Sequence, residues 1–203
     1  MIEIKDVCKS FGDHVVIDHF SETFQDGEFV ILSGPSGCGK TTLLHIIGGI
    51  EPPDCGIILY NGSNISVRHN LMEFLRFHAA FLFQNFALVD KKTVLKNLEM
   101  IPEKSRSGVT AAEALERVGL AGFEKKTVYT LSGGEQQRVA LARIMMKKCD
   151  VILADEPTGS LDSKNADMVM QILKDMSKEG KTVIVVTHAE QYLKIADRVC
   201  LLV

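Results

Sequence analysis

The segment GPSGCGKTT, residues 34–42, combines glycines, a lysine and two threonines at a spacing suited to phosphate binding. Glycines let backbone N–H groups curl around phosphate oxygens, and Lys40 can reach the outer phosphates of a nucleotide. Thr41 can ligate Mg²⁺, and a helix that starts here adds its positive N-terminal end. The expected phosphate-binding residues are Gly34, Pro35, Ser36, Gly37, Cys38, Gly39, Lys40, Thr41 and Thr42. A chance match in a glycine-rich turn is the alternative, and the flanking strand and helix patterns argue against it.

Two carboxylates and a histidine follow later apolar runs. The stretch VILADE supplies Asp155, which can hold Mg²⁺ through water, and Glu156, which can orient or deprotonate an attacking water. His188 closes another apolar run, where contact with a terminal phosphate is expected. Each of these residues alone is equally consistent with a solvated strand end. Together with the phosphate loop they predict a site that hydrolyses a nucleotide.

The stretch LSGGEQQRVALAR, residues 131–143, contains a second helix start preceded by glycines. Ser132 and Glu135 have the spacing of a capping box, in which two side chains satisfy free N–H groups at a helix start. A capping role does not account for Gly133 and Gly134, because glycine weakens a first helical turn. We expect the glycines to let something large approach the backbone closely.

Three segments predict the framework that positions these residues. Residues 28–40, 150–157 and 181–190 each begin with an apolar run and then turn polar abruptly. Continuous apolar runs flanked by helical patterns are typical of parallel strands buried on both faces. The carboxyl ends of such strands are where open α/β sheets bind ligands. The sequence therefore predicts one ligand site at one edge of a sheet.

The remaining patterns are mostly helical. A helix should run from Lys40 to a glycine stop at Gly48, a second should start at Thr110 with Glu113 in a capping box, and a third should occupy residues 163–180. Residues 2–24 alternate between apolar and polar, which favours antiparallel strands. We expect a single α/β domain over residues 1–203. It should have a P-loop NTPase core of mostly parallel sheet flanked by helices, an N-terminal antiparallel β subdomain, and an inserted helical subdomain over about residues 85–148.

Composition excludes several classes of protein. The net charge is −3 with dispersed basic residues, so no nucleic-acid partner is expected. No apolar run approaches the roughly 18 residues of a membrane span, and the N-terminus lacks the features of a signal peptide. The five cysteines show no pairing pattern and no Cys/His cluster, which suits a reducing cytoplasm, and we expect no zinc site.

In their order and in their residues these motifs resemble one family, the ATP-binding subunits of ABC transporters. GPSGCGKTT is similar to the Walker A motif, LSGGEQ to the ABC signature, and VILADEP to Walker B with its catalytic glutamate. Gln84 resembles the Q-loop glutamine, residues 160–162 the D-loop, and His188 the H-loop. The resemblance spans essentially the whole chain.

The resemblance implies an ATPase whose cofactors are ATP and Mg²⁺. Catalysis would involve Glu156, His188 and Lys40, and the metal would be bound by Thr41, Gln84 and Asp155. Phe11 would stack on adenine in place of the family's frequent tyrosine; its alternative role is core packing. Two chains would pair head to tail, with ATP bound between the P-loop of one and Ser132, Gly133, Gly134 and Glu135 of the other.

The residues of the signature, Walker B and Q-loop segments also resemble the branch of this family that serves macrolide, lipoprotein and bacteriocin export. This implies a peripheral subunit at the cytoplasmic face of the cell membrane, paired with a second copy or a homologous subunit. Transmembrane permease subunits would be separate chains. We expect a short helical subdomain and no regulatory extension after residue 203. The apolar residues 77–89 around Gln84 could contact the permease or simply fill the subdomain core.

Three alternatives compete with this interpretation, and the sequence argues against the second and the third. An ABC ATPase of a cell-division or mechanotransmission complex would move no substrate. Soluble ABC ATPases acting on DNA or ribosomes carry a long coiled coil or two nucleotide domains, and this sequence has neither. A module that only binds nucleotide would not need Glu156 and His188.

Overall fold

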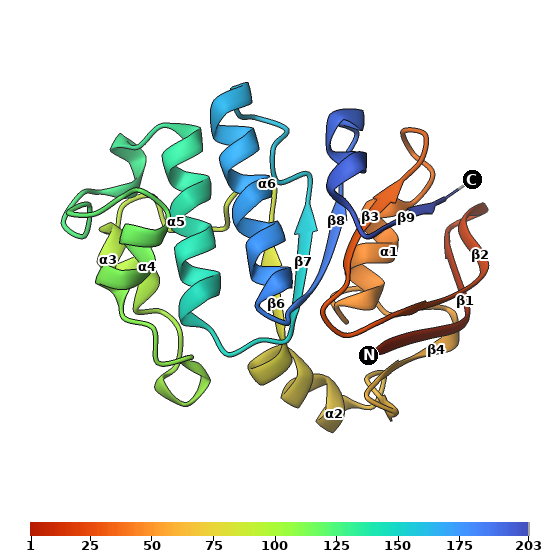
Figure 1. Cartoon of the computed structure of the whole chain (residues 1–203). Helices are drawn as coiled ribbons and strands as arrows, with labels where there is room; N and C mark the ends of the chain where they lie inside the picture. Colours follow the sequence, from red (N-terminus) through yellow and green to blue (C-terminus); the bar gives the residue numbers. More distant parts are fainter. Residues whose placement is uncertain (203) are drawn as a thin grey trace.

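The chain forms two β-sheets, which we describe for residues 1–202 from a computed structural model (Figure 1). The first sheet is antiparallel, with strand order β2-β1-β4-β5. Its strands are β1 (Ile2–Phe11), β2 (His14–Phe24), β4 (Cys55–Tyr60) and β5 (Ser63–Asn64). The predicted N-terminal antiparallel strands are therefore confirmed.

The second sheet is parallel, with strand order β6-β7-β8-β3-β9. Its strands are β3 (Phe29–Ser33), β6 (Ala79–Leu82), β7 (Val151–Asp155), β8 (Thr182–Val186) and β9 (Arg198–Leu201). The three apolar runs form buried strands of a parallel sheet, as predicted, and they are the adjacent strands β7, β8 and β3. β6 was not expected, because its four residues lie inside a longer apolar stretch that gives no strand pattern.

Helices connect the parallel strands. They are α1 (Lys40–Ile47), α2 (Arg68–Glu73), α3 (Val94–Leu98), α4 (Ala111–Arg117), α5 (Gly133–Met146) and α6 (Ser163–Lys178). A short π-helix covers Phe74–His78, and 3₁₀ turns cover Glu103–Ser105, Val128–Thr130 and Glu190–Ile195. Both predicted capping boxes are present, at the starts of α4 and α5. Within residues 1–202 we find no helix with the length and apolar character of a membrane span.

Alternate residues of the central strands enter two different apolar cores. In β3, Phe29 and Ile31 pack with α5 and α6, whereas Val30 and Leu32 pack with α1 and the antiparallel sheet. Strands β7 and β8 alternate in the same way. Complete burial of one such side chain stabilises the fold by about 1.5–3 kcal/mol, so both layers hold the sheet rigidly. The segment between β6 and β7, which includes α3 and α4, contributes its buried residues to the α5–α6 core.

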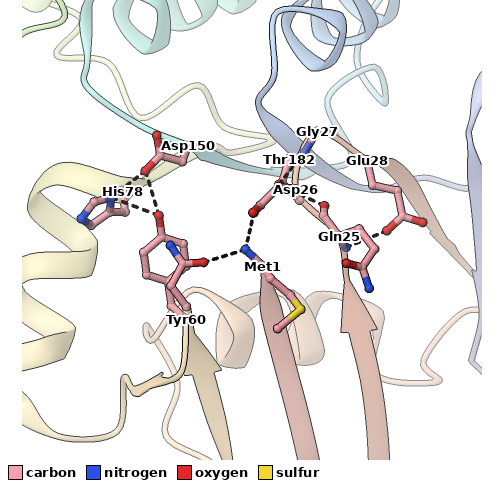
Figure 2. A network of polar contacts seen from close by, with 10 residues as sticks. Met1, Gln25, Asp26, Gly27, Glu28, Tyr60, His78, Asp150 and Thr182 are labelled. Atoms are coloured by element: carbon pink, nitrogen blue, oxygen red, sulfur yellow. Dashed lines mark hydrogen bonds and ion pairs between the residues drawn. The ribbon is translucent and has the colours of Figure 1, made fainter.

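A polar cluster joins the two sheets at the amino end of β7 (Figure 2). The hydroxyl of Tyr60, at the end of β4, donates to Asp150 Oδ2 at 2.8 Å. The Nδ1 atom of His78, at the end of the π-helix, lies 2.6 Å from the same oxygen. Burial alone would raise the pKa of Asp150, but the bonds from His78 and Tyr60 outweigh it and the pKa is lowered.

One pair of cysteines comes together although the sequence shows no pairing pattern. A disulfide joins Cys8 of β1 to Cys55 of β4, with their Cα atoms 5.0 Å apart. The two residues are 47 positions apart in the sequence, so only the antiparallel pairing of β1 with β4 brings them together. A ring nitrogen of His19 on β2 lies within 4.8 Å of both sulfur atoms, so the expected absence of a Cys/His cluster is wrong.

Candidate active site

The phosphate-binding segment forms the connection between β3 and α1. Gly39 caps α1 with φ 94°, and a Cβ atom there would meet Val16 and Ile17 side-chain atoms at 2.7–2.9 Å. Lys40 is buried, and its ammonium donates to the carbonyl oxygens of Gly34 at 2.9 Å and Pro35 at 2.7 Å. The loop therefore folds around the lysine ammonium. When a phosphate binds, the ammonium can donate to phosphate oxygens in place of these carbonyl oxygens.

One pocket of about 300 Å³ collects residues from five parts of the chain. Its lining residues are Phe11, His14, Val16, Gly37, Gly39, Lys40, Thr41, Thr42, Glu156, Val186 and His188. Phe11 is 53% exposed, which excludes the alternative of a core phenylalanine. An exposed aromatic face beside a phosphate loop is suited to stacking on a planar base.

Asp155 lies beside the phosphate loop at the carboxyl end of β7. The hydroxyl of Thr41 donates to Asp155 Oδ1 at 2.9 Å. Asp155 also lines a neighbouring cleft of about 650 Å³ together with Gln84. Hydroxyl, carboxylate and amide oxygens are the ligands that Mg²⁺ prefers, so these three predicted residues fit that ion.

Glu156 and His188 come together at the ends of β7 and β8. Glu156 Oε1 lies 3.2 Å from His188 Nε2, and the backbone N–H of Glu156 donates to the carbonyl of Val186 at 3.0 Å. Glu156 has φ 43°, an uncommon conformation for a residue other than glycine. Burial raises the pKa of its carboxyl, and the nearby His188 only partly opposes this. A carboxylate with a raised pKa is better matched to accepting a proton from water.

The signature helix α5 begins at the sheet edge where β7 ends (Figure 1). Ser132 caps it and accepts from the backbone N–H of Glu135, while the Glu135 carboxylate accepts from the backbone N–H and hydroxyl of Ser132. Ser132 is exposed, and neither it nor Glu135 lines the Phe11–Lys40 pocket. Gly133 lines the cleft that contains Asp155 and Gln84.

The reason for the second signature glycine differs from our expectation. A Cβ atom on Gly134 would meet side-chain atoms of Asn165, on α6 of the same chain, at 2.7–3.0 Å. The close approach at Gly134 therefore comes from within the protein and needs no ligand to explain it. At Gly133 the nearest atom is Phe86 Cζ at 3.7 Å, which is ordinary contact.

Two features of the site were not predicted from the sequence. His45 in the last turn of α1 lies 3.9 Å from Asp155, because helical spacing places it one turn after Thr41. Arg143 of α5 donates to the carbonyl oxygens of Ala87 at 2.6 Å and Phe86 at 3.2 Å. This arginine fixes the loop after Gln84 to the signature helix. The i, i+4 spacing of Thr41 and His45 was a sequence signal for the contact of His45 with Asp155. No sequence signal existed for the hydrogen bonds of Arg143.

Fold and site together define a P-loop ATPase. A family model described as ABC transporter matches residues 17–159, and the chain belongs to this family. It is an ATP-binding cassette ATPase, the motor class of ABC transporters.

Three known proteins illustrate the similarity. The lipoprotein-releasing system ATP-binding protein LolD of Bacteroides fragilis is 40% identical, covering 98% of this chain and 95% of LolD. The glutamine transport ATP-binding protein GlnQ of Bacillus subtilis is 38% identical, covering 98% of this chain and 85% of GlnQ. The structure of the ATP-binding cassette MJ0796, described as a dimeric post-hydrolysis state bound to ADP and Pi, superposes with a TM-score of 0.88 at 34% identity. That match covers 100% of this chain and 94% of the other.

Proposed function

We propose that this chain hydrolyses MgATP in the Phe11–Lys40 pocket and uses the cycle to drive a membrane transporter. The observation that carries the proposal is the convergence of Phe11, the phosphate loop, Glu156 and His188 on one pocket. The base would stack on Phe11, and Lys40 with the loop N–H groups would hold the phosphates.

The chemistry requires a water aligned with the terminal phosphate and stabilisation of the charge that develops on it. Glu156 is placed to take the proton of that water, and His188, 3.2 Å away, to hold the glutamate and contact the phosphate. Mg²⁺ bound by Thr41, Asp155 and Gln84 would neutralise charge on the phosphate oxygens. We assign Lys40, Glu156 and His188 as the catalytic residues.

We further propose that two copies pair head to tail around two ATP molecules. Ser132 presents an exposed hydroxyl and a helix N-terminus at the carboxyl edge of the sheet, yet lies outside its own chain's P-loop pocket. In a two-fold dimer this surface would meet the partner's ATP, with Gly133, Gly134 and Glu135 forming the rest of the contact. The similarity to a cassette described as dimeric with bound ADP and Pi supports this arrangement.

A transmembrane permease on separate chains is the proposed partner, which would place the protein peripherally at the cytoplasmic face of the membrane. An apolar cavity of about 320 Å³ lies between β6, the segment at Met100–Pro102 and α5. Exposed apolar surface of this kind is suited to receiving a helix of another protein. We take residues 85–148, which border this cavity, as a helical subdomain that transmits nucleotide state to the permease.

For the cargo we propose export of a peptide, drug or lipoprotein. The similarity to LolD over nearly both full lengths supports this choice. A comparable similarity to a glutamine transport protein means that the ATPase chain itself carries little of the cargo preference. Such preference would reside in the permease, because it is the permease that encloses the substrate.

The test of the composite site uses two inactive variants. Lys40→Ala removes the phosphate lysine, and Ser132→Arg places bulk where the partner's γ-phosphate would lie. If ATP is shared between chains, a mixed dimer keeps one site with an intact P-loop from the Ser132→Arg chain and an intact signature from the Lys40→Ala chain. We expect a mixture of the two proteins to recover part of the wild-type ATPase rate that neither shows alone.

Sedimentation gives an independent readout of the same arrangement. Glu156→Gln protein should be a dimer with ATP and a monomer without it, because a ligand that binds the dimer more tightly than the single chain shifts the population toward the dimer. Adding Ser132→Arg should abolish the dimer while leaving ATP binding to the single chain. A mixture that remains inactive, together with an ATP-independent monomer, would contradict the shared site.

A further inference from the structure

Three strands of the antiparallel sheet are irregular at the same level. Asp6 of β1 has φ 55°, His19 of β2 has φ 43°, and Gly56 of β4 has φ 77°. The pairing of β1 with β2 and with β4 shifts register at this point. Positive φ at residues other than glycine is strained, and bulges re-aim side chains beside functional sites. A Cβ on Gly56 would meet the Asp6 carbonyl oxygen at 2.3 Å, so the irregularity depends on a glycine there.

Side chains that bind soft metal ions lie together at this irregular part of the sheet. Cys8 and Cys55 are direct cross-strand partners, and a ring nitrogen of His19 lies within 4.8 Å of both sulfur atoms. His19 Nδ1 lies 2.7 Å from Asp6 Oδ1. An ionised carboxylate can only accept, so the contact with Asp6 favours the neutral imidazole tautomer with its proton on Nδ1, in which Nε2 has the lone pair that a metal requires. Histidines that bind zinc are oriented by this same type of carboxylate contact.

We propose that Cys8, Cys55 and His19, in the reduced protein, form a binding site for Zn²⁺. Two thiolates and an imidazole are the donors that Zn²⁺ takes in tetrahedral sites, and they discriminate against Mg²⁺ and Ca²⁺, which take oxygen. His19 is exposed and both cysteines are half-buried, so water can reach the fourth position. Within residues 1–202 no other group of three such side chains meets the same distance criterion.

The disulfide is the oxidised, metal-free form of this site. Reduction by a phosphine breaks the S–S bond with two electrons from phosphorus; water supplies the oxygen of the phosphine oxide and the protons of two thiols. Zn²⁺ then displaces both thiol protons and binds the two thiolates, so metal binding and the disulfide exclude each other. The site lies outside the Phe11–Lys40 pocket, so its occupancy can be measured without reference to ATP hydrolysis.

The experiment titrates Co²⁺, a spectroscopic substitute for Zn²⁺, into protein that has been reduced with a phosphine and desalted without oxygen. We expect one equivalent to bind with thiolate-to-cobalt charge-transfer absorption, and Zn²⁺ to displace it. Cys8→Ser and Cys55→Ser should each lose this absorption, and His19→Ala should weaken binding at least about 10-fold. Matched controls are Cys38→Ser and His69→Ala, a cysteine and an exposed histidine elsewhere, which should bind Co²⁺ as the wild type does.

The oxidised wild-type protein keeps the test decisive if a variant fails to fold. It has the same sequence and an intact disulfide, and it should show no charge-transfer absorption with Co²⁺. Equal binding by the oxidised and reduced forms would overturn the proposal. The absence of thiolate–cobalt absorption from the reduced protein, once all five thiols have been counted as free, would overturn it equally.

Discussion

Glu156 illustrates how a single residue combines backbone strain with chemistry. Its φ of 43° directs the side chain from the end of β7 toward His188, and burial raises the pKa of its carboxyl. A strained, partly buried carboxylate does not improve stability, and its presence at a strand end supports the catalytic role that we propose for it. Gln has nearly the same shape but cannot accept a proton from water.

Replacing this residue should separate nucleotide binding from turnover. We expect Glu156→Gln to bind ATP with near wild-type affinity and to hydrolyse it at least about 100-fold more slowly, as for the loss of a general base. Equilibrium binding and phosphate release measure the two quantities. Glu179→Gln, at the exposed end of α6, is the control and should hydrolyse ATP normally. Turnover of the Glu156→Gln protein within a few-fold of wild type would refute the assignment.

Cys38 should be the first free thiol to react. It is half-buried in the phosphate loop with its sulfur 3.7 Å from Lys40 Nζ, whereas Cys149 and Cys200 are buried and Cys8 is bonded to Cys55. We expect a thiol-alkylating reagent to modify Cys38 and inhibit ATP hydrolysis, and MgATP to protect against both. Mass spectrometry locates the modified residue. Equal inhibition of Cys38→Ser protein would show that another group is responsible.

At the scale of elements, the start of α5 provides a matched pair of glycines. Gly133→Ala meets only ordinary contacts and removes a flexible residue from the first helical turn, so stability should be unchanged or rise by up to about 1 kcal/mol. Gly134→Ala collides with Asn165 on α6, so it should lose about 1–3 kcal/mol through overpacking. Urea unfolding measures the free energy of unfolding of both variants, and an unchanged m-value shows that the difference is one of stability. Similar effects of the two substitutions would contradict the contact with Asn165.

The Tyr60–His78–Asp150 cluster should make the junction of the sheets sensitive to acid. The lowered pKa of Asp150 means that its ionised form stabilises the fold above the unfolded value of about 3.9, and that this contribution is lost as pH falls through the folded pKa. Asp150→Asn should therefore lower Tm at neutral pH, with the difference from wild type shrinking toward zero in acid. The exposed Asp90→Asn is the control. A difference that stays constant with pH would exclude the ionic contribution.

The sequence predicted those elements whose signals are local. The apolar runs of β3, β7 and β8, the capping boxes and the phosphate loop each lie within about ten residues. β6 was missed because its apolar residues continue without a break into Phe83, so neither period nor boundary marks it. The Cys8–Cys55 pair and the Gly134–Asn165 contact depend on which strands and helices become neighbours, and no local pattern encodes that.

For the molecule as a whole, the proposed permease contact can be tested at Met100. Its side chain is 47% exposed and lines the apolar cavity beside β6. Met100→Asp should abolish stimulation of the ATPase by the copurifying membrane protein, because a charge cannot be buried there without a partner. ATP binding by the isolated chain should remain unchanged. Met168→Asp, at a 37% exposed methionine on α6, is the matched control, and equal loss in both variants would argue against this surface.

Phe83 lines both the apolar cavity and the cleft that contains Asp155 and Gln84. Its ring stacks on Phe81 at 5.3 Å between centroids and meets His45 edge-on at 6.4 Å. The two cavities therefore have the side chain of Phe83 in common. If the proposed permease contact in the first cavity displaced this ring, the displacement would directly change the shape of the cleft beside Asp155, so the two proposed sites would be coupled through one side chain.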